Sequence, residues 1–319
     1  MRMAFINKLC QLAKEDERIF LLTGDLGFSV LEQFKEAFPK RFINAGVAEA
    51  NMIGVAAGLS LSGKVVFVYS IIPFVTMRCY EQVRNDLCQQ NLDVKIIGVG
   101  GGLSYGTAGP THHAIEDIAI MRALPNMTVV CPGDPIETEF AVEQAVSYEG
   151  PIYIRLGKGN EPNVHETIPE FKIGKGIILK NGNDLNILAT GNMLENAKIV
   201  ADRLEKEGIN ASVISMHTIK PLDVDLIKDL AYSGEPMFTI EEHSIIGGLG
   251  SAVANILAES NSRVIFKRIA LPDAYIKNVG DQEYLRYLNS LSIEKIMNKI
   301  LKEINNQPDD KASRRGSIS

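Results

Sequence analysis

Cysteine is scarce in this 319-residue sequence, and so are long apolar runs. The four cysteines, Cys10, Cys79, Cys88 and Cys131, are scattered, and no pair has the CxxC spacing of many zinc and redox sites. This pattern argues against a disulfide framework and against a metal bound by cysteines. We therefore expect reduced, mostly buried thiols in a cytoplasmic protein.

An apolar stretch that could cross a membrane is also missing, since no run approaches the roughly 20 residues that a span needs. The N-terminal segment MRMAFINKLCQLAKEDER lacks the apolar core of a signal peptide. Positive charge is not in excess either, because the net charge is -6. Neither a nucleic acid nor a membrane is therefore expected as a partner.

Short apolar segments alternate with longer amphipathic ones through the first half of the chain. The short segments are rich in Val, Ile, Leu and Phe, as in parallel strands that are covered on both faces. The alternation predicts an α/β domain with an open, mostly parallel sheet and helices on both faces. The expected strands cover residues 19–23, 42–44, 65–69, 94–99, 127–131 and 152–156, and the expected helices cover 4–14, 30–38, 48–61, 76–90, 114–124 and 135–148.

A turn-rich stretch with prolines and several glycines divides the chain. We expect a first domain at residues 1–160, a linker at 161–184 and a second domain of the same class at 185–305. The expected strands of the second domain cover 185–190, 211–216, 237–241 and 264–269, and its helices cover 194–207, 224–231, 248–259 and 293–304. The polar residues 306–319 are expected to form a disordered tail.

Two segments of the first domain carry residues suited to chemistry. In GVAEANMIGVAAGLSLSG, Glu49 begins a helix of small residues. Taken alone, Glu49 fits an ordinary first-turn acid that the helix dipole favours. In GGGLSYGTAGPTHHAIED, a glycine-rich loop follows a strand and ends at His112 and His113, just before a helix. Ligands bind beyond the carboxyl ends of strands in open α/β sheets, so a histidine in this loop is expected to face a site.

These motifs resemble those of the transketolase family. GVAEANM, followed by a helix, a strand and then GPTHHAIEDIAIMRALPNMTVVCPGDPIE, is similar to the family's pyrimidine-binding domain, and SMHTIKPLD and GGLGSAVANIL resemble its C-terminal domain. The resemblance extends to about residue 305. It implies thiamine diphosphate as the cofactor and transfer of a two-carbon ketol unit from a ketose or ketose phosphate donor to an aldose acceptor as the reaction.

The resemblance also implies roles for four residues of the first domain. Glu49 matches the catalytic glutamate, which hydrogen-bonds to the pyrimidine ring and promotes activation of the cofactor. His112 matches the GPTH histidine beside the reacting carbons, where it can stabilise oxyanions and move protons. Phe74 is expected to stack on the aminopyrimidine, although plain core packing is its alternative. Asp25, in LTGDLGFS, matches an acid near the cofactor.

Arg2, Ser29 and Arg155 resemble the family's contacts to the sugar phosphate, for which arginine is well suited. Two positions depart from the family pattern. Gly100 stands where full-length transketolases have a phosphate-binding histidine, and Ala108 stands where they have an aspartate that contacts the acceptor. These losses predict a roomier acceptor side, and the sequence does not identify the sugars.

No GDG…N-type motif that could hold a metal and a diphosphate is found in the sequence. The resemblance therefore implies a separate N-terminal subunit that binds Mg²⁺ or Ca²⁺ and the diphosphate, with an α2β2 assembly in which this chain self-associates. An alternative is the β subunit of a 2-oxoacid dehydrogenase or a related thiamine-diphosphate enzyme. A catalytically idle scaffold is a third possibility, and the presence of both Glu49 and His112 argues against it.

Overall fold

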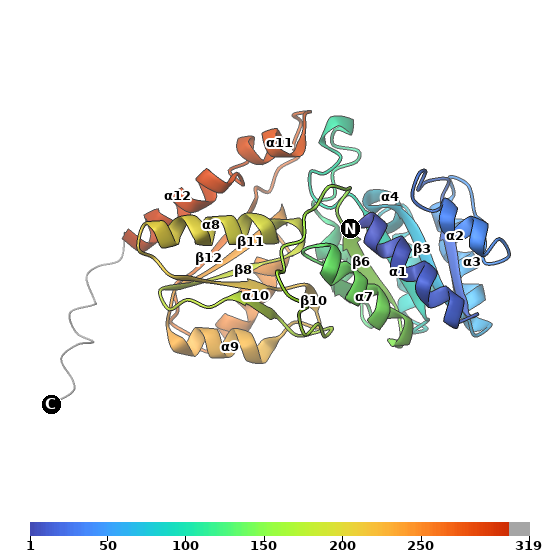
Figure 1. The fold of residues 1–319 in the computed structure, drawn as a ribbon, viewed down its shortest axis with the longest axis horizontal. Helices are drawn as coiled ribbons and strands as arrows, with labels where there is room; N and C mark the ends of the chain where they lie inside the picture. The colour runs from blue at the N-terminus through green and yellow to red at the C-terminus, as the bar shows by residue number, and fades with distance from the viewer. Residues whose placement is uncertain (306–319) are drawn as a thin grey trace.

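Two open, mostly parallel sheets form the frame of this computed structural model, in which residues 1–305 are described. The first sheet has seven strands in the order β10-β5-β6-β4-β3-β1-β2, and the second has five in the order β12-β11-β8-β9-β7. Figure 1 shows the two units side by side, the first in blue to green and the second in yellow to red. The expected α/β fold with two domains is confirmed. The predicted tail at 306–319 lies outside the described residues.

The central strands of the first sheet are buried because helices cover both of its faces. Every residue of β3 and β4 is buried, which explains why their sequences are apolar at successive positions rather than at alternate ones. Strands β1 to β6 pair in parallel. Their bounds are β1 Ile19–Thr23, β2 Phe42–Asn44, β3 Val65–Ile71, β4 Val94–Val99, β5 Thr128–Val130 and β6 Ile152–Leu156.

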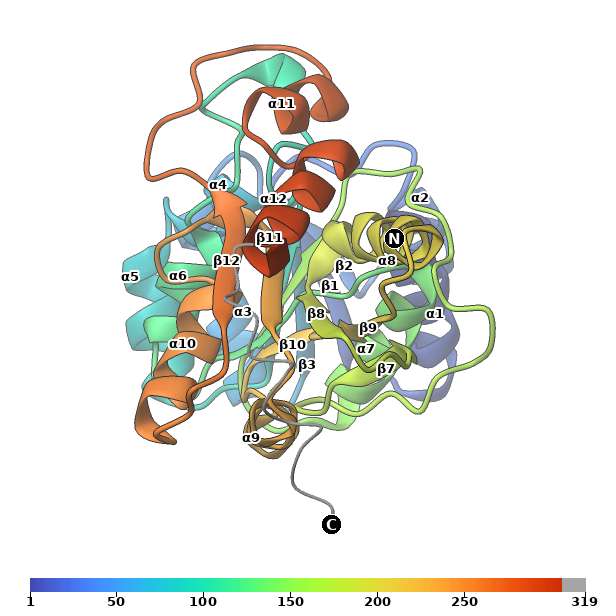
Figure 2. The same ribbon diagram turned by 90° about the vertical axis from the view of Figure 1, so that its left-hand side faces the viewer.

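The helices of the first domain divide between the two faces of its sheet (Figures 1 and 2). Helices α1 and α7 pack together on one face, and α3, α4 and α6 cover the other. The bounds are α1 Arg2–Glu15, α2 Glu32–Ala37, α3 Glu49–Leu61, α4 Ile72–Thr76, α5 Tyr80–Gln82, α6 Asp117–Ala123 and α7 Pro135–Ser147. The start of α7 is encoded locally, since Asp134 accepts a hydrogen bond from the Glu137 amide and a proline follows it.

The second domain has α8 and α12 on one face of its sheet and α9 and α10 on the other (Figure 1). Helix α11 lies beside the glycine-rich loop of the first domain in both views (Figures 1 and 2). The strands are β7 Ile177–Lys180, β8 Leu185–Ala189, β9 Ala211–Ser215, β10 Thr218–Lys220, β11 Met237–Ser244 and β12 Phe266–Leu271. The helices are α8 Leu194–Lys206, α9 Val224–Ser233, α10 Leu249–Glu259, α11 Gln282–Leu288 and α12 Ile293–Asn305.

Three features of the structure differ from the expected pattern. Strand β7 lies inside the expected linker and pairs antiparallel with β9 at an incompletely buried edge, where an apolar pattern is weak. Strand β10 follows β9 by a short connection but joins the edge of the first sheet, antiparallel to β5. In place of the single helix expected at 76–90, the chain forms α5 and a π-helical turn at Val83–Cys88, and α4 ends at Thr76, where that helix was expected to begin. Among residues 1–305, no helix is long and apolar enough to cross a membrane.

Candidate active site

The expected site residues lie at one edge of the first sheet. Strands β2, β1, β3, β4 and β6 are neighbours and run parallel, so their carboxyl ends meet at the same edge. The segment after β1 carries Asp25, the start of α3 after β2 carries Glu49, and α4 after β3 carries Phe74. The loop after β4 carries His112. An edge of this kind is where open α/β sheets bind ligands.

Glu49 and Phe74 are joined by a residue that the sequence did not single out, Arg78. The Glu49 side chain is almost fully buried, and both of its carboxylate oxygens accept from Nη1 of Arg78 at 3.3 Å. The guanidinium carbon of Arg78 lies 3.8 Å from the centroid of the Phe74 ring. The Glu49 carboxylate and the Phe74 ring therefore face the same space, which the flat guanidinium of Arg78 occupies.

His112 also contacts Phe74. The two rings meet edge to face with centroids 5.2 Å apart, and Tyr105 lies 6.0 Å from His112 on the glycine-rich loop. Nδ1 of His112 is 3.0 Å from the Thr111 hydroxyl oxygen, so this contact orients the imidazole. The structure thus brings Glu49, Phe74 and His112 together.

Asp25 lies in a tight turn next to the same space. Its Oδ1 accepts from Nδ2 of Asn44 at 3.0 Å, and its backbone N–H donates to Oδ1 of Asn44, also at 3.0 Å. These reciprocal bonds stabilise a residue whose φ of 58° lies in the left-handed region. The neighbouring Gly24 adjoins Glu49, since a Cβ at Gly24 would lie 3.7 Å from Oε1 of Glu49. The exposed Asp25 carboxylate is therefore close to the site.

Two cations lie close to Tyr105. The ammonium of Lys158 lies 4.7 Å from the centroid of the Tyr105 ring, and a Cβ at Gly159 would lie 3.3 Å from Nη2 of Arg2. Burial raises the pKa of Tyr69 to about 12, although the nearby Arg2 guanidinium opposes that rise. Arg2 therefore lies among Tyr69, Tyr105 and the segment that carries Lys158.

The start of the chain is held in place, which keeps Arg2 in position. The amino group of Met1 lies 3.1 Å from Oε2 of Glu161, and the pair is largely buried. Ser29 lies on the exposed turn after β1, two residues beyond Gly27, whose added Cβ would lie 3.2 Å from Tyr69. Ser29 is thus on the Tyr69 side of the same edge.

Arg155 has a different place from the one expected for a phosphate contact. Its Nε donates to Oδ2 of Asp117 at 2.8 Å, and its Nη2 donates to the backbone oxygens of Ala114 and Glu242. The residue is 3% exposed. Its guanidinium joins the two domains, because Glu242 belongs to β11. The reason is positional: Arg155 lies within β6, whereas Lys158, which no sequence motif marked, follows the end of that strand.

At Gly100, the structure does not show the extra space that was expected on the acceptor side. A Cβ atom at Gly100 would overlap the ring of Tyr105, so the space over this glycine is filled. Gly100 also has a φ of 90°, which favours glycine. The aromatic ring follows five residues later on the same loop, and no local pattern marks it as the occupant. Ala108 is exposed in a short 3-10 turn at Gly106–Ala108.

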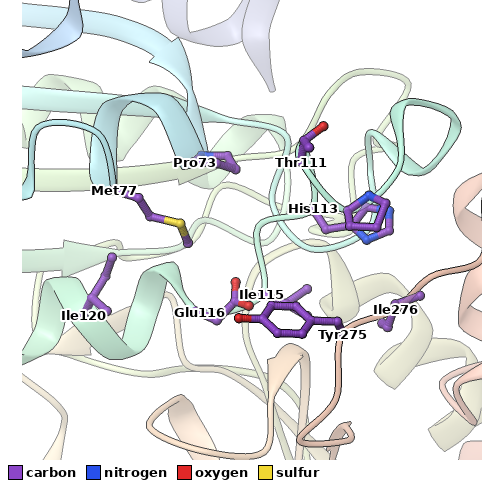
Figure 3. Close-up of a pocket in the computed structure, with 10 residues that line it drawn as sticks. Pro73, Met77, Thr111, His113, Ile115, Glu116, Ile120, Tyr275 and Ile276 are labelled. Carbon is purple, nitrogen blue, oxygen red and sulfur yellow. The ribbon is translucent and has the colours of Figure 1, made fainter.

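A cavity of about 420 Å³ lies beside these residues, between the two domains (Figure 3). Pro73 and Thr111, the neighbours of Phe74 and His112 in sequence, are on one side of it, and Tyr275 from the second domain is on another (Figure 3). Glu116 also lines the cavity, and burial raises the pKa of its carboxyl group. The second domain therefore completes one wall of the space next to the site.

Family comparisons agree with this geometry. Residues 1–163 match the model of the transketolase pyrimidine-binding domain, and residues 174–290 match the model of the transketolase C-terminal domain. The chain belongs to the transketolase family. A putative transketolase C-terminal section from Methanocaldococcus jannaschii is 40% identical over 307 residues, which cover 95% of this chain and 96% of that protein.

Other relatives of this transketolase chain are single subunits of larger enzymes. An apulose-4-phosphate transketolase subunit from Phocaeicola vulgatus is 39% identical, over 88% of this chain and 90% of its own. A 6-deoxy-6-sulfo-D-fructose transketolase subunit from Clostridium sp. is 38% identical, over 93% of this chain and 92% of its own. These relatives support a transketolase subunit over the β subunit of a 2-oxoacid dehydrogenase.

Solved structures lead to the same family. A split-gene transketolase described as an inactive β4 tetramer superposes with a TM-score of 0.88 at 38% identity, over 96% of this chain and 99% of that one. A transketolase mutant from Pichia stipitis, at 22% identity, shares the fold with a TM-score of 0.79, but the match covers only 45% of its chain. This transketolase chain therefore corresponds to one part of the longer enzyme.

The family implies thiamine diphosphate, and the residues present suit its pyrimidine half. The Arg78 guanidinium, a flat group with N–H donors, lies over the Phe74 ring and donates hydrogen bonds to the buried Glu49 carboxylate. A ring with N–H donors can make the same two contacts. In the described part of the chain, no group of three or more His, Cys, Asp or Glu residues could hold a metal ion.

Proposed function

We propose that this chain is the pyrimidine-binding half of a two-chain transketolase that uses a phosphorylated ketose as its donor. The observation that carries the proposal is the meeting of Glu49, Phe74 and His112 at the carboxyl edge of one sheet. Both domain matches and the subunit names of the relatives support it.

Thiamine diphosphate, when bound, supplies the nucleophilic carbon that accepts the two-carbon unit. The residues of this chain bind and orient. Phe74 stacks on the pyrimidine, and the Glu49 carboxyl group hydrogen-bonds to a ring nitrogen. In the tautomer in which the Thr111 hydroxyl donates to Nδ1 of His112, Nε2 carries the proton and can donate to a substrate oxygen.

A phosphate group on the donor sugar would lie near Arg2 and Lys158, with Ser29 as a further contact. Two cations close to Tyr105 favour an anionic end of the substrate. Two relatives are named for anionic ketoses, apulose 4-phosphate and 6-deoxy-6-sulfo-D-fructose, and this agrees with an anion-binding side. Arg155 is not part of this group, because its guanidinium is committed to the domain interface.

The partner in this proposal is an N-terminal transketolase subunit that holds the diphosphate through Mg²⁺ or Ca²⁺, in a cytoplasmic α2β2 assembly. One face of α3 supports an interface with another chain. It exposes Val55 and Leu61 beside Gly54 and Gly58, where an added Cβ would meet nothing within 4 Å. Small residues of this kind let another backbone approach closely. The solved split-gene relative, a tetramer of β chains, is described as inactive, in line with this proposal.

Reconstitution tests the proposal. The purified chain is expected to bind thiamine diphosphate poorly and to show no cleavage of ketose phosphates, because the metal-binding half is absent. Addition of an N-terminal transketolase chain that forms a complex with it is expected to restore both, as measured by calorimetry and by aldehyde release. Full activity of the isolated chain would contradict the two-chain proposal.

A further inference from the structure

No sequence motif marked Arg78 as a site residue, yet its guanidinium contacts Phe74 and Glu49 as a bound ligand would. Its guanidinium lies over the face of Phe74 at 3.8 Å and donates to both carboxylate oxygens of Glu49 at 3.3 Å. A flat group that stacks on an aromatic ring while donating N–H bonds to a carboxylate has the recognition features of an aminopyrimidine. Both groups cannot occupy the same face of Phe74 at once.

We infer that Arg78 occupies the aminopyrimidine position in the free chain and must leave it when thiamine diphosphate binds. This inference rests on the proposed function. The role of Arg78 is thus to hold Glu49 and Phe74 in their binding arrangement and, at the same time, to compete with the cofactor.

The surroundings of Arg78 allow it to move. Its side chain is 49% exposed, whereas the Glu49 side chain is 3% exposed, so the arginine reaches inward from solvent. Among the described residues, Glu49 is the acceptor of both hydrogen bonds that the Arg78 guanidinium donates. Half-exposed ion pairs are weak, because water and salt compete with them. Arg78 can therefore leave without breaking a buried network.

The contact with Arg78 stabilises the buried Glu49 carboxylate while the cofactor is absent. A buried carboxylate without a partner is costly, and the start of α3 supplies only part of the compensation. Arg78 supplies the remaining hydrogen bonds. Arg155 offers a contrast: its pairing with Asp117 is buried on both sides, with exposures of 3% and 0%, and is permanent packing rather than a replaceable contact.

Competition of this kind predicts tighter cofactor binding when the arginine is removed. In the reconstituted complex with the N-terminal subunit, Arg78→Ala is expected to lower the Kd for thiamine diphosphate by about threefold to tenfold, the range set by a partly exposed ion pair with a cation–π contact. Arg78→Lys keeps the charge but loses the planar guanidinium, so its Kd for thiamine diphosphate is expected to lie between those of the native complex and of Arg78→Ala. Arg84→Ala is the matched control, since the exposed Arg84 donates to its neighbour Asn85 and, among the described residues, not to Glu49.

The experiment is isothermal calorimetry of the complex with thiamine diphosphate, combined with a double-mutant cycle. If Arg78 competes through Glu49, the gain from Arg78→Ala should shrink in a Glu49→Gln background. Circular dichroism and thermal melting check that each variant is folded. If Arg78→Ala does not fold, the Kd of Arg78→Lys tests the inference in its place.

The outcomes separate this inference from the proposed function. A lower Kd for Arg78→Ala, with no change for Arg84→Ala, supports the inference. An equal or higher Kd for Arg78→Ala, in a native complex that does bind thiamine diphosphate, overturns the inference alone. A native complex that fails to bind thiamine diphosphate overturns the proposed function together with it.

Discussion

The ring of Tyr105 packs directly over the α carbon of Gly100. The two residues belong to one loop, and the backbone at Gly100 has a φ of 90° that makes room for the ring. Tyr105 in turn has His112 on one side and the ammonium of Lys158 over its face. The glycine therefore leaves room for an aromatic ring that lies near both His112 and Lys158.

Gly100→Ala is expected to destabilise the chain, because the methyl group would overlap Tyr105 and strain the backbone. Overpacking and the left-handed conformation together predict a loss of about 2–5 kcal/mol in the free energy of unfolding. Gly208→Ala is the matched control. Gly208 also has a positive φ, of 79°, but an added Cβ there meets nothing within 4 Å. Its expected loss is about 1 kcal/mol. Urea titrations of both variants measure the difference, and equal losses would contradict the packing argument.

Truncation of Arg155 is expected to lower the stability of the chain far more than truncation of Lys158. Arg155→Ala leaves the buried Asp117 carboxylate without its ion-pair partner and is expected to lower stability by about 3–5 kcal/mol. Lys158→Ala removes an exposed cation and is expected to change stability by less than about 0.5 kcal/mol. Thermal unfolding of the two variants checks this order of stabilities.

Lys158→Ala should instead affect the substrate. In the reconstituted enzyme, the KM for a phosphorylated ketose is expected to rise about tenfold, while the KM for the matching unphosphorylated ketose stays unchanged. Steady-state kinetics with both sugars measures the contrast. An equal change for the two sugars would show that Lys158 does not bind the phosphate.

Glu49→Gln preserves the shape of the side chain but cannot change its protonation state in the same way. Turnover of the reconstituted enzyme is expected to fall by at least about a hundredfold, in line with general acid–base contributions. Thiamine diphosphate should still bind within about tenfold of the native affinity, a difference of roughly 1.4 kcal/mol. Glu81→Gln, which changes an exposed acid on α5, is the control for a general loss of charge. Near-native turnover of Glu49→Gln would show that this carboxyl group is not catalytic.

A buried pair, Glu137 and His165, predicts a pH dependence of stability. Nε2 of His165 lies 2.8 Å from Oε1 of Glu137. Burial by itself would lower the pKa of His165, but the hydrogen bond and charge of Glu137 outweigh it and raise the pKa above its usual value near 6.5. Burial opposes ionisation of Glu137, whereas its bonds to His165 and other groups lower its pKa below 4.5.

The signs of these two shifts fix the pH window. The contribution of His165 is complete below its unfolded pKa and is lost as the pH rises through its raised, folded pKa. The contribution of Glu137 is complete above its unfolded pKa and is lost as the pH falls through its lowered, folded pKa. Compared with the native chain, His165→Gln is therefore expected to lose about 1–2 kcal/mol near pH 5.5 and less at pH 8.5. Unfolding titrations at the two pH values measure this, and a constant difference would contradict it.

The sequence by itself determined the class of the fold and the centre of the site. Strands covered on both faces need apolar residues at successive positions, and this requirement is local, so β1, β3, β4 and β6 could be predicted to within a few residues. The GPTH run and the helix that begins at Glu49 are also local patterns. Because parallel strands end at one edge, the predicted order of elements already implied that Glu49 and His112 could meet.

Only the tertiary structure decided which long side chains reach that site. Arg155 and Lys158 are three residues apart, and both are cations near the end of one strand, yet one binds Asp117 in the interior and the other lies over Tyr105. Arg78 meets Glu49 across 29 positions of sequence, and β10 leaves its own domain to join the first sheet. Each outcome depends on which loops converge in space. Local periodicity encodes the burial of a residue, but it does not encode the partner of a flexible charged group.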